Sequence, residues 1–164
     1  MIFSNNIFAK FQKVFTILQQ KNISISTAES CTGGLLSALF TELDGSSKIF
    51  DRGFITYSNQ SKISLLEVNE ELLKNHGAVS QEVAIAMAIG ALKKSQSKIA
   101  IATTGIAGPQ GGTLQKPVGT VYIAIASTEK SICQKFYFGN DRQLNRWKTV
   151  EEAINLLEIF LKEI

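Results

Sequence analysis

Apolar residues near the start of the chain recur at intervals of three and four positions. One face of a helix repeats every 3.6 residues, so this pattern predicts an amphipathic helix over residues 4–20. Its apolar stripe consists of Phe3, Ile7, Phe8, Phe11, Val14, Phe15 and Leu18. The next segment, NISISTA at 22–28, alternates isoleucine with serine and predicts a strand. Helical spacing returns from Thr32 to Leu43 and ends at the turn cluster DGSS.

The remainder of the chain continues to alternate between strand-like and helical patterns. The predicted elements are, in order, a strand at 48–58, helices at 59–68, 69–77 and from Ser80 onward, a buried strand at 98–105, two strands at 120–128 and 132–138, and a long helix from about Asp141. The last two strands are joined by a short turn and are expected to pair antiparallel.

This order of elements predicts the fold class. Helices that alternate with buried apolar strands indicate an α/β protein, here a three-layer α/β/α sandwich with a mixed, mostly parallel sheet of about five strands. The 164 residues are expected to form a single domain over residues 1–164. Ligands of such sheets bind beyond the carboxyl ends of the strands. The segments AESCTGG, TYSNQSK and TTGIAGPQGG all fall there, so we expect these three loops to converge.

Composition and charge limit the classes of partner and cofactor that we expect. The chain is 45% hydrophobic and 19% charged, and its net charge is only +3 without a run of like charges. We therefore expect neither a nucleic acid nor a membrane as partner, and a reducing cytoplasm as the location. Cys31, Cys133 and His76 are the only cysteines and histidine, too few for a structural zinc site. No metal and no cofactor are predicted.

Ser30 is the first candidate for chemistry. A serine between a strand and a helix can simply cap the helix, and Ser30 or Thr32 fits that role. A nucleophilic serine needs a base, and no motif surrounds the lone His76. Lys62 is the better candidate, since burial in a cleft lowers the pKa of a lysine. Neutral Lys62 could accept the Ser30 proton, with the Tyr57 hydroxyl relaying or orienting it.

The glycine-rich segment TTGIAGPQGG is the second candidate. Its glycines allow the backbone to approach a ligand closely, and successive N–H groups can bind an anion. It matches neither a Walker A loop nor a dinucleotide-binding fingerprint. Thr104 at the strand end could contact a substrate through its hydroxyl. Arg142, at the start of the last helix, could pair with a phosphate or carboxylate.

Five segments in this order resemble the CinA carboxy-terminal domain family: TAESCTGG, RGFITYSNQSK, HGAVS, TGIAGPQGG and KPVGTVYIAI. That family includes the stand-alone nicotinamide-nucleotide amidase. The resemblance implies hydrolysis of nicotinamide mononucleotide, a small-molecule substrate, to nicotinate mononucleotide and ammonia, without a metal. It also implies a homo-oligomer.

The resemblance further assigns roles to residues. Ser30, Tyr57 and Lys62 fall on the family's catalytic positions, with Ser30 as nucleophile and Lys62 as base. The expected substrate-binding residues are Cys31, Thr32, Gly33, Thr104, Gly105 and Arg142. The N–H groups of Cys31 or Thr32 would hold the negative oxygen of the intermediate.

Three alternative interpretations stay open at this point. Cys31 could be the nucleophile with Glu29 as base and Lys62 as stabiliser, because a helix N-terminus lowers a thiol pKa. An oxidoreductase of the short-chain type also combines serine, tyrosine and lysine, but it needs the last two four residues apart, and Tyr57 and Lys62 are five apart. The third is a nucleotide-binding or regulatory domain without turnover.

Overall fold

Helices and strands follow one another in the order that the sequence predicts. The computed structural model describes residues 3–164. The elements are α1 (Asn5–Gln20), β1 (Ile25–Glu29), α2 (Leu35–Phe40), a short 3₁₀ turn η1 (Ser46–Lys48), β2 (Phe50–Ile55), α3 (Asn59–Leu66), α4 (Glu70–His76), α5 (Gln81–Lys93), β3 (Ile99–Gly105), β4 (Thr120–Ser127), β5 (Ser131–Tyr137) and α6 (Arg142–Lys162).

The five strands form one mixed sheet in the order β2-β1-β3-β4-β5. Strand β1 pairs parallel with both β2 and β3, whereas β4 pairs antiparallel with β3 and with β5. Four strands therefore run in one direction and only β4 runs in the other. The carboxyl ends of β1, β2 and β3 meet at one edge of the sheet, as the alternating pattern predicted.

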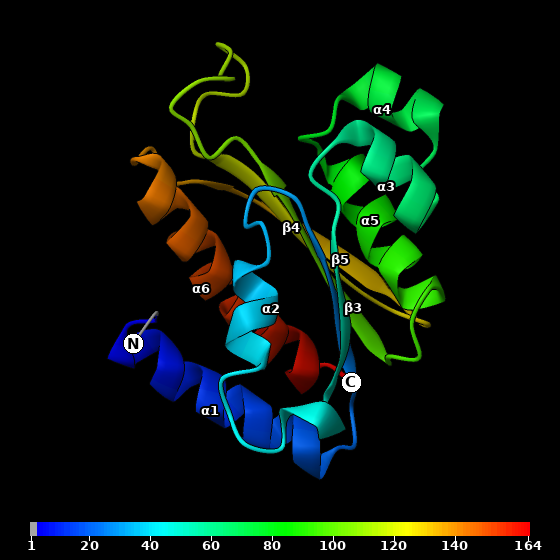
Figure 1. The fold of residues 1–164 in the computed structure, drawn as a ribbon, viewed down its shortest axis with the longest axis vertical. Coiled ribbons are helices and arrows are strands. Elements are labelled where there is room, and N and C mark those ends of the chain that lie inside the picture. Colours follow the sequence, from blue (N-terminus) through cyan, green and yellow to red (C-terminus); the bar gives the residue numbers. More distant parts are fainter. Residues whose placement is uncertain (1–2) are drawn as a thin grey trace.

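Helices cover both faces of this sheet (Figure 1), so the predicted three-layer α/β/α class is confirmed. Helices α1, α2 and α6 pack on one face around a large core that includes Phe11, Phe40 and Phe160. Helices α3, α4 and α5 pack on the other face around a smaller core that includes Leu66 and Met87. Strand residues alternate between these two cores, as expected for a sheet buried on both sides.

Most helices begin where a polar side chain accepts a hydrogen bond from the first turn. The capping residues are Ser4, Ser58, Asn69, Ser80 and Asp141. Helix α2 is the exception, because Gly34 precedes it with φ +96° and provides no side-chain cap. The prediction of a helix over 32–43 is therefore too long at both ends. Within the described part of the chain, no helix has the length and apolar character needed to cross a bilayer.

Candidate active site

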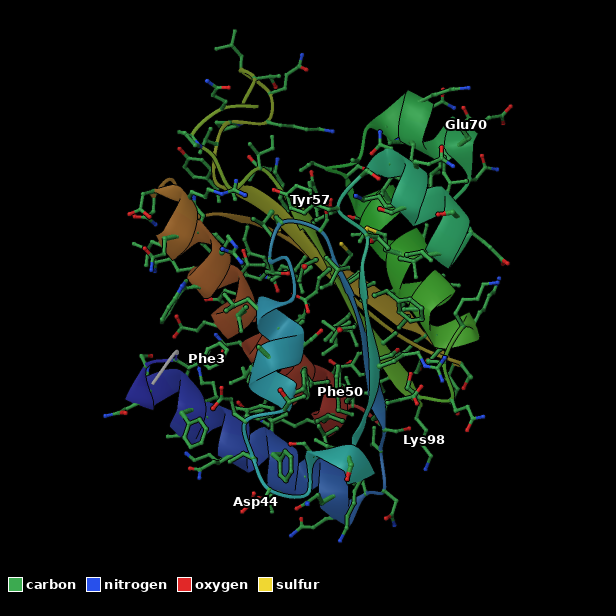
Figure 2. The ribbon with its side chains drawn as sticks, in the orientation of Figure 1. Phe3, Asp44, Phe50, Tyr57, Glu70 and Lys98 are labelled. Atoms are coloured by element: carbon green, nitrogen blue, oxygen red, sulfur yellow. The ribbon has the colours of Figure 1, made fainter. Side chains whose placement is uncertain are left out.

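A cavity of about 280 Å³ lies at the edge of the sheet where β1, β2 and β3 end. Figure 2 shows Tyr57, which follows β2, at this edge, whereas Phe50 at the start of β2 lies toward the opposite end. The three loops that were expected to converge all contribute to the lining. Of the predicted site residues, the lining contains Ser30, Cys31, Tyr57, Lys62, Thr104, Gly105 and Arg142.

The floor of this cavity contains a lysine in contact with a serine. Helix α3 places Lys62 in its first turn, and Ser58 and Ser61 form a capping box that fixes this turn. The Lys62 Nζ lies 3.1 Å from Ser30 Oγ and donates to the Thr56 carbonyl at 2.8 Å. Lys62 is only 1% exposed. Burial disfavours the ammonium and lowers the pKa of Lys62 from 10.5 to about 8.

Ser30 is held in place mainly through its backbone. Its N–H donates to the Thr103 carbonyl at 2.9 Å, and its carbonyl accepts from the Gly33 N–H at 3.2 Å. The hydroxyl therefore projects from a fixed turn between β1 and α2. Among residues 3–164, no oxygen accepts a hydrogen bond from the N–H of Cys31 or Thr32. These are the donors that the sequence suggested for the negative oxygen of an intermediate.

Glu29 has a structural role beside Ser30 that the sequence reasoning missed. Its side chain is fully buried, and its carboxylate accepts from the backbone N–H groups of Gly34, Leu36 and Ser37 at 2.7–3.0 Å and from the Ser37 hydroxyl at 2.5 Å. Glu29 thereby supplies the cap that α2 lacks. The prediction that Ser30 or Thr32 caps this helix is wrong. An acidic residue just before a helix is a favourable N-terminal signal that could have indicated this role.

The pKa of the Cys31 thiol is raised, whereas the sequence suggested that it is lowered. Burial is the main cause that raises the pKa of Cys31 from 9.0 to about 12, and the nearby Glu29 contributes in the same direction. The prediction of a lowered thiol pKa is wrong, because desolvation outweighs the hydrogen bonds and the Lys62 charge that lower it. The Glu29 oxygens face the N–H groups of α2. The alternative in which Glu29 activates Cys31 therefore has no support in this geometry.

Thr32 and Gly33 do not line the cavity, although both were expected to bind substrate. The Thr32 hydroxyl is hydrogen-bonded to the Thr103 hydroxyl at 2.8 Å, and the Thr32 carbonyl accepts from Arg146 at 2.7 Å. Gly33 has φ +59°, which favours glycine in this turn. Both residues shape the turn that follows Ser30.

Thr104 and Gly105 line the cavity at the end of β3. The Thr104 hydroxyl donates to the Ala78 carbonyl at 2.7 Å and so ties β3 to the segment before α5. A Cβ at position 105 would lie 2.6 Å from a methyl carbon of Val121. Glycine is therefore needed here for close packing against β4, and not only for the approach of a ligand.

Arg142 and Tyr57 lie at the mouth of the cavity. Arg142 donates to the Tyr57 hydroxyl and to the Gly108 carbonyl, both at 2.8 Å. Tyr57 is 59% exposed, and within the described residues its hydroxyl is not hydrogen-bonded to Lys62 or Ser30. The expected proton relay through Tyr57 is thus not assembled in this structure. No carboxylate in residues 3–164 forms an ion pair with Arg142, and no acidic residue lines the cavity.

Cys31 and Cys133 are both free thiols. In the part of the chain that the structure describes, no group of three or more His, Cys, Asp or Glu side chains is placed to hold a metal ion. The donors gathered at this edge of the sheet are instead hydroxyls, backbone N–H groups and two cationic side chains.

The fold and the site together define an α/β/α protein with a buried serine–lysine pair at the carboxyl edge of a mixed sheet. The model of the CinA C-terminal domain matches residues 9–161, and the chain belongs to this family. A putative competence-damage inducible protein of Caldicellulosiruptor saccharolyticus is 51% identical over 144 residues, which cover 88% of this chain and 35% of that relative. A CinA-like protein of Chloroherpeton thalassium is 50% identical over 149 residues, or 36% of its length. The chain thus spans about a third of these curated relatives.

Solved structures give the same result. The competence/damage inducible protein CihA of Agrobacterium tumefaciens superposes with a TM-score of 0.93 at 41% identity, covering 98% of each chain. A CinA superfamily protein of Klebsiella pneumoniae superposes with a TM-score of 0.94 at 32% identity, covering 98% of this chain and all of the other. The resemblance inferred from the five sequence segments is therefore confirmed at the level of the family.

Proposed function

We propose that residues 1–164 form one amidase domain that hydrolyses the carboxamide of nicotinamide mononucleotide to nicotinate mononucleotide and ammonia. The contact between Lys62 Nζ and Ser30 Oγ at 3.1 Å carries this proposal. A serine hydroxyl is a poor nucleophile unless a base removes its proton. A buried lysine with a pKa of about 8 is partly neutral near physiological pH and can act as that base.

In the first half of the proposed reaction, Ser30 attacks the amide carbon. The bond between Oγ and carbon forms while the Ser30 proton moves to neutral Lys62. The amide oxygen becomes negative and accepts hydrogen bonds from the free N–H groups of Cys31 and Thr32. The carbon–nitrogen bond then breaks as Lys62 returns its proton to the leaving nitrogen. Ammonia departs and a nicotinoyl ester of Ser30 remains.

In the second half, water replaces ammonia. Lys62 takes a proton from a water molecule, which attacks the ester carbon, and the same N–H groups hold the negative oxygen. The ester bond breaks, the proton returns to Ser30 Oγ, and the carboxylate product leaves. Amide and water are thus converted to carboxylic acid and ammonia, which are carboxylate and ammonium near neutral pH. The cycle uses the side chains of Ser30 and Lys62 and backbone N–H groups of the turn that follows β1. The Thr56 carbonyl supports both halves, because it holds Lys62 Nζ at 2.8 Å.

The charge of the cavity supports an anionic substrate. Its lining contains two cationic side chains, Lys62 and Arg142, and no acidic residue. Within residues 3–164, the acceptors of Arg142 are two neutral oxygens, so its charge is available to a phosphate. Ala78, Val79 and Ile106 provide an apolar wall against which a pyridine ring can pack. The identity of the mononucleotide comes from the family resemblance, and the homo-oligomer also stays a prediction.

Ammonia release from nicotinamide mononucleotide tests the proposal. The wild-type protein is expected to release ammonia without added metal, Ser30→Ala is expected to release none, and Cys31→Ala is expected to retain activity. Cys31 is the matched control, because it lines the same cavity next to Ser30. Loss in Cys31→Ala with activity in Ser30→Ala would move the nucleophile to the thiol. Binding of the mononucleotide without any ammonia release would indicate a nucleotide-binding domain without turnover.

A further inference from the structure

We infer that Glu29 is the residue that positions both Ser30 and Lys62, although it touches neither reacting atom. This inference rests on the proposed role of the Ser30–Lys62 pair. Glu29 is the last residue of β1 and directly precedes Ser30. Its side chain is fully buried, beneath the turn that carries the nucleophile.

The side chain of Glu29 fixes the nucleophile turn. Two backbone N–H groups donate to one carboxylate oxygen, from Gly34 at 2.9 Å and Leu36 at 3.0 Å. The N–H and hydroxyl of Ser37 donate to the other oxygen. The chain from Ser30 to Gly34 is therefore closed at both ends by one residue, through a peptide bond at Ser30 and hydrogen bonds at Gly34.

The backbone of Glu29 fixes the base. Its carbonyl accepts from the Thr56 N–H at 2.8 Å, and the Thr56 carbonyl in turn accepts from Lys62 Nζ at 2.8 Å. Glu29 thus lies at the junction of two short connections, one to Ser30 and one to Lys62. Ser30 follows β1, whereas Lys62 lies in α3, which follows β2. Their 3.1 Å contact therefore depends on this junction between the two segments.

The charge of Glu29 is compensated locally and not by Lys62. Among the described residues no Lys or Arg side chain forms an ion pair with Glu29, and four hydrogen bonds satisfy its oxygens. A carboxylate with two to four N–H and O–H donors is well stabilised when buried. Because Glu29 accepts from the N–H groups at the start of α2, these groups are not available to an oxyanion. The proposed oxyanion donors are therefore the N–H groups of Cys31 and Thr32. The residue acts by geometry, and it is not an acid or a base in the reaction.

A fluorophosphonate that labels activated serines tests this inference independently of the natural substrate. In the labelling step the Ser30 Oγ–P bond forms, the P–F bond breaks, fluoride leaves, and the serine proton passes to Lys62. Glu29→Gln replaces one acceptor oxygen with an NH₂ group that faces the N–H groups of α2. We expect the rate constant of labelling to fall at least about tenfold, because small displacements of a nucleophile are costly. The pH midpoint of labelling is expected to stay near that of the wild type.

Two further variants make the test decisive. Glu42→Gln is the same chemical change at an exposed residue just beyond α2, and it is expected to label like the wild type. Glu29→Asp keeps the charge but shortens the reach by one methylene, so it is also expected to label slowly, and it serves if Glu29→Gln does not fold. Circular dichroism of each variant shows whether the labelled protein is native.

Three results would overturn the inference. These are labelling of folded Glu29→Gln or Glu29→Asp at the wild-type rate, a loss that comes with a shifted pH midpoint, and a wild-type protein that is not labelled at Ser30. The shifted midpoint would mean that Glu29 acts on Lys62 through its charge. A wild-type protein that is labelled at Ser30 but releases no ammonia from the mononucleotide would refute the proposed substrate alone.

Discussion

Replacement of Lys62 by methionine is expected to change the pH dependence of folding stability in a calculable way. The folded protein holds this lysine with a pKa of about 8, whereas the unfolded chain has the ordinary 10.5. Each tenfold change in proton affinity corresponds to about 1.4 kcal/mol, so the charged lysine destabilises the native state by about 3 kcal/mol at pH 7. Methionine has a similar length and carries no charge. Lys62→Met removes this destabilising contribution together with the proposed base.

The sign follows from the direction of the pKa change. Between pH 8 and 10.5 the unfolded chain binds more protons at this position than the folded protein, so wild-type stability rises with pH. By pH 10 the contribution has fallen to about 1 kcal/mol. The stability advantage of Lys62→Met over the wild type should therefore shrink by about 2.5 kcal/mol from pH 7 to pH 10. The lost hydrogen bond to the Thr56 carbonyl costs about 1–3 kcal/mol at every pH and does not alter this difference.

Urea denaturation of both proteins at pH 7, 8, 9 and 10, followed by circular dichroism, measures the effect. Other titrating groups, including Cys31, are present in both proteins and cancel in the comparison. Lys74→Met is the matched control, since Lys74 is exposed and forms a surface ion pair with Glu70. The difference in unfolding free energy between Lys74→Met and the wild type is expected to stay constant from pH 7 to pH 10. A Lys62→Met difference that changes by less than about 0.5 kcal/mol over this range would refute a strongly lowered lysine pKa.

Three other outcomes are expected. The kcat/KM for ammonia release should rise about tenfold per pH unit below pH 8 and level off above it, because only neutral Lys62 accepts a proton; a flat profile from pH 6 to 9 would contradict this. Arg142→Ala should raise the KM for the mononucleotide about tenfold but not the KM for the phosphate-free riboside, with Arg52→Ala as control; equal losses for both substrates would count against phosphate binding. Gly90→Ala would place a Cβ 2.2 Å from the Leu66 carbonyl oxygen, where α5 packs against α3. The urea midpoint should therefore fall by an amount equivalent to about 2 kcal/mol, and an unchanged midpoint would refute this close packing.

The sequence was sufficient for the order of elements because periodicity and capping are local properties. The stripe from Ile7 to Leu18 and the helix that starts at Ser80 both appear in the structure where the pattern put them. Helix α2 was predicted too long because of local backbone conformations that apolar spacing does not reveal. Gly33 and Gly34 adopt positive φ angles, so the residues before Leu35 form a turn instead of a helix. Apolar spacing alone does not distinguish these conformations.

The candidate site was only partly accessible from the sequence. Convergence of the loops at one edge followed from the alternation of strands and helices. The pairing of Ser30 with Lys62 was suggested by the need of a serine for a base and then by the family resemblance. The high pKa of Cys31 was missed, because it depends on how completely neighbouring elements exclude water from the thiol. The role of Glu29 was missed as well, since strand position does not tell which way a carboxylate faces. Tyr57 was expected beside the base, but its hydroxyl is hydrogen-bonded to Arg142.

Helix α6 follows the strands of the sheet in the sequence and packs against α1, and this order has a consequence during synthesis. Its buried face packs in the same core as Phe11 of α1. Lys10 of α1 donates to the Asn155 side chain of α6, and Lys21, the C-cap of α1, donates to the Leu161 carbonyl. A nascent chain that has just completed β5 therefore lacks the helix that packs with α1 and α2 on one face of the sheet, and part of the apolar surface of that face and of α1 stays exposed. Such non-local pairing slows folding and exposes apolar surface. The same helix begins with Arg142. The guanidinium at the cavity mouth is therefore synthesised after the other residues that line the cavity.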